Sequence, residues 1–189
     1  MRRIKFMALV TLLVCTQLPA KADTNQRATE SYSKKEVMVT AEGLFGSTTA
    51  GLAKAIERAF SDLGEPNAFI EGQEFSAAMM IGLRYGEGTL NTKNAPPKKV
   101  YWQGPSVGYD FGGQISKVLT LVYNLKDPDA IYRRFSGVDG SLYFFAGVSL
   151  NYQSVGTITL VPIRTGLGMR MGANVGYLHY NKEHSWLPF

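Results

Sequence analysis

The chain has 189 residues, of which 45% are hydrophobic, a formal net charge of +5 and a single cysteine. Residues 1–22 hold four cations and no acidic residue, so the rest of the chain carries a net charge of only +1. That balance argues against the basic surface of a nucleic-acid-binding protein. Because Cys15 lies in the same segment, residues 23–189 can form no disulfide and offer no cysteine ligand to a metal.

The N-terminal segment has the order of features found in a secretory signal peptide. A basic start precedes an apolar run over residues 7–18, and the Ala20–Ala22 motif places small residues around a cleavage site. The run is shorter than the roughly 20 residues that a membrane-spanning helix needs. The bulky Val14 before Cys15 disfavours a lipoprotein anchor. We therefore expect export and cleavage after Ala22.

The first elements of the mature chain are expected to follow a polar lead-in. Residues 23–35 lack hydrophobic periodicity and predict a flexible segment, with a single domain over residues 36–189. Residues 37–40 are rich in β-branched side chains and predict a short strand. A helix is expected next, with Ser47 as its N-cap. Its apolar positions are Leu52, Ile56, Ala59, Phe60 and Leu63.

From residue 67 onward, most segments alternate with the period of a β-strand. Six strands are expected first: Ala68–Gly72, Phe75–Tyr85, Thr89–Lys93, Val100–Gly104, Val107–Phe111 and Ser116–Asn124. Three longer ones follow over residues 142–152, 157–163 and 169–177, after a short helix that Asp127 caps and Gly137 ends. Pro162 is expected at an edge or a bulge, because proline cannot donate to a strand ladder.

Several of these strands carry apolar or very small residues on both faces, which an open sheet with one wet face would not need. Gly172 and Gly176, for example, lie opposite Met171 and Val175. Glycines on one face allow close approach of another segment. The sequence therefore predicts a mainly β fold with a minor α component: a small antiparallel β-barrel of about eight strands with one or two packed helices.

Motifs that would indicate catalysis or metal binding are present but lack their usual context. Residues 104–108 match the pattern G-x-S-x-G around Ser106, but no helix is expected after the serine, so a hydrolase stays an alternative interpretation only. His179 and His184 lie near the C-terminus beside Glu183, without a second group of ligands. We expect no catalytic residue, no bound cofactor and no metal site.

Aromatic and cationic residues near the ends of strands are the candidate contacts for a ligand or partner. The candidates are Tyr101, Trp102, Arg170, Trp186 and Phe189. A terminal phenylalanine is also typical of outer-membrane barrels, but Pro188 and residues 181–184 break the alternation that their last strand requires. An integral membrane protein is therefore not expected.

Five segments, in order along the chain, resemble the EipA envelope-integrity family. They are Gly43-Leu44-Phe45-Gly46-Ser47-Thr48 with Gly51-Leu52-Ala53, Gly82-Leu83-Arg84-Tyr85-Gly86-Glu87-Gly88-Thr89-Leu90, Tyr101-Trp102-Gln103-Gly104-Pro105-Ser106, Gly172-Ala173-Asn174-Val175-Gly176-Tyr177-Leu178 and Trp186-Leu187-Pro188-Phe189. The resemblance implies a periplasmic β-barrel protein of Gram-negative bacteria that supports resistance to envelope stress. It implies no enzymatic activity and no catalytic residues.

A looser likeness to lipid-binding SYLF domains lies in the glycine-rich β architecture with an N-terminal helix. It suggests that the partner is an envelope component, which is a lipid, a glycan or a protein. The expected function is thus non-catalytic support of the cell envelope in the periplasm, with a periplasmic hydrolase acting on an envelope component as the alternative.

Overall fold

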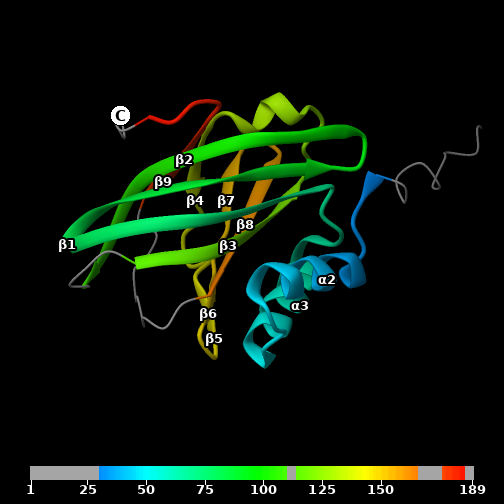
Figure 1. Cartoon of the computed structure of the whole chain (residues 1–189), viewed down its shortest axis with the longest axis horizontal. Helices are drawn as coiled ribbons and strands as arrows, with labels where there is room; N and C mark the ends of the chain where they lie inside the picture. The colour runs from blue at the N-terminus through cyan, green and yellow to red at the C-terminus, as the bar shows by residue number, and fades with distance from the viewer. Residues whose placement is uncertain (1–29, 110–113, 166–175, 186–189) are drawn as a thin grey trace, which may run out of the picture.

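The structure is a computed structural model that describes residues 30–109, 114–165 and 176–185, without the side chains of residues 76–82, 106–109 and 114. It is a closed antiparallel β-barrel with two helices packed side by side against its outer wall (Figure 1). The predicted fold class is confirmed.

Helix α2 (Lys34–Phe45) replaces the strand predicted over residues 37–40, so that prediction was wrong. Ser33 and Glu36 form a capping box, in which each side chain accepts a hydrogen bond from the other residue's backbone N–H. Val37 and Ala41 lie four residues apart and are both buried against the barrel. The capping box and the burial of residues at helical spacing thus stabilise a helix here, although the β-branched side chains of residues 37–40 favour a strand.

Helix α3 (Ala50–Leu63) confirms the second predicted element, with a different start. Thr49, and not Ser47, is the N-cap, and its side chain accepts a hydrogen bond from the backbone N–H of Leu52. Gly51 is buried so tightly that a Cβ there would lie 2.1 Å from the Phe145 carbonyl oxygen. Glycine at this position therefore lets the start of α3 lie directly on the strand behind it.

Nine strands make up the sheet within the described part of the chain. Their bounds are β1 Ala68–Thr92, β2 Ala95–Tyr109, β3 Gln114–Tyr123, β4 Arg134–Gly137, β5 Tyr143–Phe145, β6 Val148–Leu150, β7 Gln153–Val155, β8 Ile158–Thr165 and β9 Tyr177–Asn181, with a 3₁₀ helix, η1, at Pro128–Ile131. The order is β3-β1-β2-β9-β4-β7-β8-β6-β5, and pairing of β3 with β8 closes the barrel.

Strand β1 merges three predicted strands and doubles back on itself (Figure 1). A Cβ on Gly72 would lie 2.3 Å from the Glu87 carbonyl oxygen, and one on Gly88 would lie 2.5 Å from that of Glu71. The first arm pairs with β3 and the second arm with β2. The described wall has eight strand positions when the two arms of β1 count separately, β6 and β7 count as one interrupted strand, and β5, which pairs only with β6, is left out.

Pro162 does not lie at an edge, but its neighbour is interrupted where the proline stands. Strand β8 pairs with β3 on one side, where Pro162 faces Thr120. On its other side, β8 pairs first with β6 and then with β7. The two pairings share one register, but Asn151 and Tyr152, which lie between β6 and β7, form no ladder pairs with β8. The register places Asn151 opposite Pro162. The missing N–H of proline is thus accommodated by a break in the adjacent ladder.

Two further segments differ from the prediction. The long strand expected over residues 142–152 is a hairpin, because Ala146 and Gly147 both have positive φ and turn the chain between β5 and β6. The short helix after Asp127 ends at Ile131, and the residues after it continue as β4. The strand expected over residues 169–177 lies mostly outside the described residues.

The hydrophobic core has two parts, one on each side of the barrel wall. One cluster lies between the helices and the outer faces of β3, β6 and β8, and includes Ile56, Leu121 and Ile163. The second fills the barrel interior and includes Trp102 and Tyr180. Complete burial of such side chains contributes about 1.5–3 kcal/mol each. The interior is therefore packed with side chains over this part of its length.

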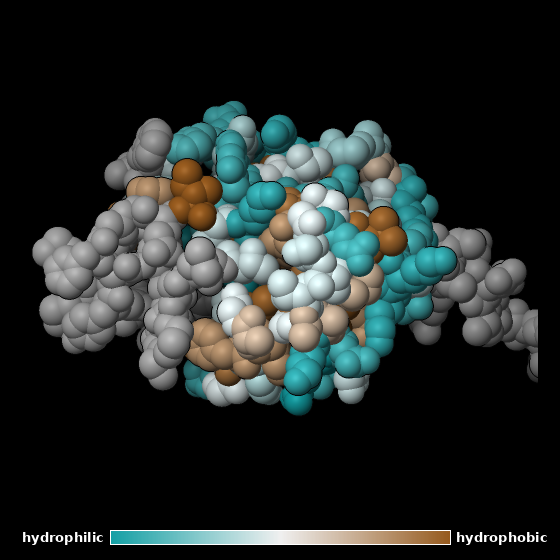
Figure 2. Space-filling model, turned by 60° about the horizontal axis from the view of Figure 1, so that its bottom comes forward, coloured by the Kyte–Doolittle hydropathy of each residue, from teal (hydrophilic) through white to brown (hydrophobic). Residues whose placement is uncertain are grey.

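The outer surface is predominantly hydrophilic on the face shown in Figure 2, where hydrophobic residues form separate patches. On β1, Gln73 and Glu87 are exposed and contact one another on the outside of the wall. Within the described part of the chain, no helix has the length and apolarity to cross a bilayer.

Candidate functional site

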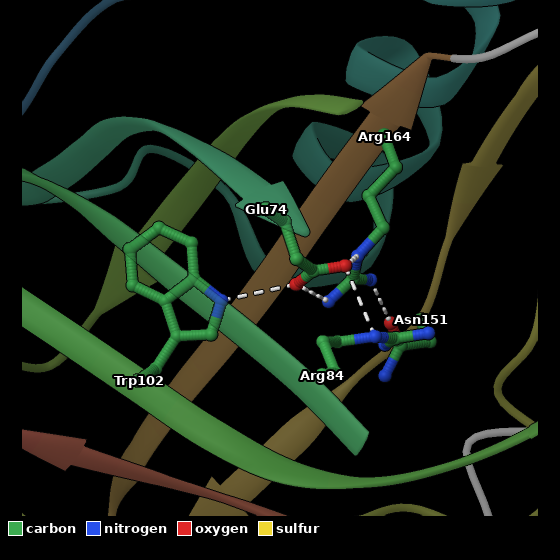
Figure 3. A network of polar contacts seen from close by, with 5 residues as sticks. All are labelled: Glu74, Arg84, Trp102, Asn151 and Arg164. Carbon is green, nitrogen blue, oxygen red and sulfur yellow. Dashed lines mark hydrogen bonds and ion pairs between the residues drawn. The ribbon is translucent and has the colours of Figure 1, made fainter. Parts of the chain in front are cut away.

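A buried carboxylate, Glu74, is the centre of a polar network inside the barrel (Figure 3). Its Oε1 lies 3.0 Å from the Nε atoms of both Arg84 and Arg164. Its Oε2 accepts hydrogen bonds from Trp102 Nε1 at 3.0 Å and from Arg164 Nη2 at 3.4 Å. Arg164 Nη1 also donates to Asn151 Oδ1 at 2.8 Å. We call these five residues the ionic centre.

Five parts of the barrel wall contribute to the ionic centre, namely the two arms of β1, strand β2, the break between β6 and β7, and strand β8. Glu74 is on the first arm of β1 and Arg84 on the second, two positions from Gly72 and Gly86 respectively. Residues two apart on a strand point to the same side of the sheet. Arg164 comes from β8, where β8 lies against β3 and β6. Closure of the barrel therefore brings these distant side chains together.

Glycines create the space for the Trp102 indole. A Cβ on Gly86 would lie 2.0 Å from the Trp102 Cε2 atom, and one on Gly72 would lie 2.8 Å from its Cη2 atom. The indole thus occupies the room that two side chains would otherwise fill, and its N–H reaches Glu74. Glycines on the inner side of β1 consequently orient one donor of the ionic centre.

The charges of the ionic centre do not cancel, since two guanidinium groups face one carboxylate. Burial opposes ionisation of Glu74, but the positive charges of Arg164 and Arg84 outweigh it and hold the pKa of this carboxyl below its ordinary value. The Arg84 and Arg164 side chains are only 10% and 11% exposed. Counted over the five residues of the ionic centre alone, the formal charge is +1.

Two buried amide side chains, Asn151 of the ionic centre and Gln153, have hydrogen-bonding groups without a partner among the described residues. Asn151 is 2% exposed; its Oδ1 accepts a hydrogen bond from Arg164, and its Nδ2 has no acceptor among the described residues. Gln153, also 2% exposed, has an unpaired Oε1. A buried polar group without a partner destabilises a protein by about 1–3 kcal/mol. In folded proteins, ordered water or another polar group usually satisfies such buried atoms.

The chemistry available at the ionic centre is recognition of an anion and not proton transfer. Guanidinium groups carry several N–H donors, keep their charge at all physiological pH values and bind planar or tetrahedral oxyanions. Glu74 accepts hydrogen bonds from Trp102 and Arg164 and forms an ion pair with Arg84, and its lowered pKa makes it a weak base. This donor set suits a carboxylate or phosphate group, whereas a metal ion would be repelled by the arginines.

The structure places two of the five predicted contact residues. Trp102 belongs to the ionic centre and is 2% exposed. Its neighbour Tyr101 points to the other side of β2, where its ring packs edge-on against His184 with 5.7 Å between centroids. Arg170, Trp186 and Phe189 lie outside the described residues.

The other sequence motifs do not meet at the ionic centre in the part of the chain that is described. His179 pairs with Arg134 across β9 and β4, and burial together with the Arg134 charge lowers its pKa. No three His, Cys, Asp or Glu side chains in that part are grouped to hold a metal ion. The side chain of Ser106 is outside the described residues.

Sequence reasoning missed four of the five members of the ionic centre. Glu74 was one of several scattered carboxylates, and Arg84 was part of a glycine-rich motif. A usable signal was present on β1. Glu74 and Arg84 occupy alternate positions of the strand together with Gly72, Gly86 and Gly88, so their charged side chains point to the inner side of the sheet. Nothing local marked Arg164 or Asn151, because only barrel closure brings them near Glu74.

Comparisons with known proteins give a family and a related structure. The sequence model of a family described as Envelope integrity protein A matches residues 30–189. The chain is similar to the crystal structure of an uncharacterized beta-barrel-like protein from Brucella abortus, with 51% sequence identity and a TM-score of 0.77. That match covers 85% of this chain and 99% of the other. No curated protein matches the chain.

Proposed function

The chain belongs to the envelope integrity protein A family, and from this we propose that it is a periplasmic, non-catalytic protein that supports the cell envelope by binding one of its components. The family match over residues 30–189 is the observation that carries the proposal. It begins after the predicted signal peptide. Export with cleavage after Ala22 would thus deliver the barrel to the compartment where the envelope is assembled and maintained.

The geometry of the ionic centre supports binding in preference to catalysis. A general base needs an accessible lone pair and a pKa near the working pH. Glu74 has neither, since three side chains donate to or pair with it and the arginines lower its pKa. A buried cationic group with an unpaired amide donor beside it is suited to hold a ligand in place.

Deletion and complementation test the proposal. The gene is deleted in the source bacterium, and growth is measured with detergent or an outer-membrane-disrupting agent. We expect the deletion strain to be at least about tenfold more sensitive in plating efficiency, and the full chain to restore growth. A variant that lacks residues 2–22 should remain in the cytoplasm and fail to complement.

Two results would contradict the proposal. One is unchanged stress resistance in the deletion strain. The other is full complementation by the variant without residues 2–22, because the protein would then act without export. Fractionation with antibody detection verifies where each form accumulates, so that poor expression is not mistaken for loss of function.

A further inference from the structure

A cleft of about 950 Å³ opens at one end of the barrel, and none of its lining residues belongs to the ionic centre. Its walls are the segments before α2 and β1, the turn between β1 and β2, and the loop between β3 and η1. In Figure 1 the β1–β2 turn lies beside the start of α2, and Lys93 of this turn pairs with Glu36 of α2 at 3.1 Å. A cleft of this volume is large enough for a small ligand.

Hydrogen bonds hold the segments around the cleft together. Asn67, before β1, makes two of them with Leu125, after β3. Its Nδ2 donates to the Leu125 carbonyl oxygen at 2.6 Å, and its Oδ1 accepts from the Leu125 N–H at 3.1 Å. Ser31 Oγ, before α2, donates to Glu65 Oε2 at 2.5 Å. A ligand thus meets a cleft that is already formed, which lowers the entropic cost of binding.

The lining of the cleft is polar, but it has no surplus of either charge. Nine of the thirteen lining residues carry polar side chains. Two of these are acidic, Glu30 and Glu65, and two are basic, Lys93 and Lys126. An acyl chain needs a mainly apolar lining, and a polyanion needs a surplus of cations. Neither kind of ligand suits this cleft.

An extended peptide is also poorly suited to this end of the barrel. Such a peptide binds by adding a strand to an open edge of a sheet. Strands β1, β2 and β3 border the cleft, and each of them already has a neighbouring strand on both sides. The side chains of the cleft, and not its backbone, must therefore recognise the ligand.

The lining side chains match the chemistry of a sugar ring, which has hydroxyl groups at its rim and C–H groups on its faces. A hydroxyl group both donates and accepts hydrogen bonds. Asn94 and Lys126 are exposed donors, and within the described part of the chain their side chains form no hydrogen bond or ion pair. Glu30 supplies an acceptor. Leu63, which is 39% exposed, supplies an apolar surface that C–H groups can cover.

We propose that this cleft binds an uncharged sugar unit of an envelope glycan. The inference rests on the proposed function, because it selects a glycan as the class of envelope component. Hydroxyl groups of the sugar pair with the Asn94 amide, the Lys126 ammonium group and the Glu30 carboxylate. Since Asn94 and Lys126 are exposed, the rest of the glycan extends from the cleft into solvent.

Nuclear magnetic resonance of the isotope-labelled mature protein tests the inference, because it detects weak binding and shows where the ligand binds. The uncharged probes are the trisaccharides of glucose and of N-acetylglucosamine. The charged probes are the trisaccharide of galacturonic acid and dihexanoyl phosphatidylglycerol. We expect saturable amide shifts in the segments that form the cleft with at least one uncharged probe. The absence of such shifts with both, or tighter binding of a charged probe in the cleft, would overturn the inference.

Two variants test the residues that are assigned to the sugar. Lys126→Ala should lower the affinity for the bound trisaccharide about tenfold, because a hydrogen bond from a charged group is lost. Asn94→Ala removes the second donor and should also weaken binding. Lys54→Ala is the matched control, since it removes an exposed lysine of α3 outside the cleft, and it should bind as wild type does. Amide signals far from the cleft verify that each variant is folded. Unchanged affinity in both cleft variants would overturn the inference.

The outcome is separable from that of the proposed function. If the full chain restores stress resistance but neither uncharged trisaccharide binds in the cleft, the sugar site is contradicted while the envelope function stands. If a trisaccharide binds as expected but deletion of the gene leaves stress resistance unchanged, the envelope function is contradicted and the sugar site stands.

Discussion

At the scale of single residues, Glu74 is the residue on which most other side chains of the ionic centre depend. It holds Arg84, Arg164 and the Trp102 indole through its two oxygens. When one partner of a buried ion pair is removed, an uncompensated charge remains, which destabilises a protein more strongly than loss of the pair as a whole. The carboxylate thus has a structural role whatever the ligand is.

Replacement of Glu74 should show this dependence. We expect Glu74→Gln to lower the free energy of unfolding by about 3–5 kcal/mol, because two arginines would remain buried without their carboxylate. Urea denaturation followed by circular dichroism measures the change. Glu87→Gln is the matched control on the outer face of the same strand and should change stability by no more than about 0.5 kcal/mol. Equal effects of the two substitutions would contradict the assigned role.

The glycine beneath the indole makes a second residue-level prediction. Gly86→Ala should destabilise the protein by about 1–3 kcal/mol and shift Trp102 emission, because its Cβ would lie 2.0 Å from the indole. Gly43→Ala is the control: it lies inside α2 with nothing within 4 Å of its Cβ. Alanine there should stabilise the helix by up to about 1 kcal/mol. Destabilisation by both variants would show that the clash is not the cause.

At the scale of elements, one helix was missed and the other was predicted with a displaced start. Residues 37–40 have strand-like composition, but the capping box of Ser33 and Glu36 begins a helix there, and the Ser33 hydrogen bonds lower the pKa of Glu36 to about 2. Composition reports local preference only, whereas burial of Val37 and Ala41 on the barrel decides the outcome.

The start of α3 gives a direct test at this scale. Thr49→Ala should lower stability by about 1 kcal/mol, because the Thr49 hydroxyl accepts from the backbone N–H of Leu52. Ser47→Ala, at the position that the sequence predicted as the cap, should have little effect. Thermal unfolding of both variants under the same conditions provides the comparison. A larger loss for Ser47→Ala would contradict the assigned boundary.

The strands were largely predictable, but their connections were not. Period-two alternation located the segments that form β1, β2, β3 and β8. It could not show that β1 is continuous through three predicted strands, or that the strand beside Pro162 is interrupted at Asn151. Both features depend on which strands become neighbours when the barrel closes, and that information is not local.

At the scale of the whole molecule, the same reason explains why the barrel was predicted and the ionic centre was not. Hydrophobic alternation, glycine content and the net charge of the mature chain can be obtained from the sequence without knowledge of which residues are in contact, and they are sufficient to predict a fold class. The hydrogen bond between Glu74 and Arg164 joins residues 90 positions apart. Of the members of the ionic centre, only Trp102 was a candidate from the sequence, as one of several aromatic residues that could contact a ligand or partner.

The pH dependence of stability is a property of the whole molecule that reflects this centre. The pKa of Glu74 is lower in the folded protein than the ordinary value near 4.5. Its contribution is therefore fully present above about pH 4.5 and is lost as the pH falls toward the folded pKa. Wild type should lose stability more steeply than Glu74→Gln between about pH 5 and pH 3, measured by urea denaturation. Parallel curves would contradict the lowered pKa.

Native mass spectrometry of the protein purified from a periplasmic extract tests the central claim most directly, namely that the protein binds a component of the cell envelope. Wild type should carry a reproducible additional mass, and extraction should release a lipid, a glycan or a protein of the envelope. A wild type that has the mass of the polypeptide alone would contradict the claim.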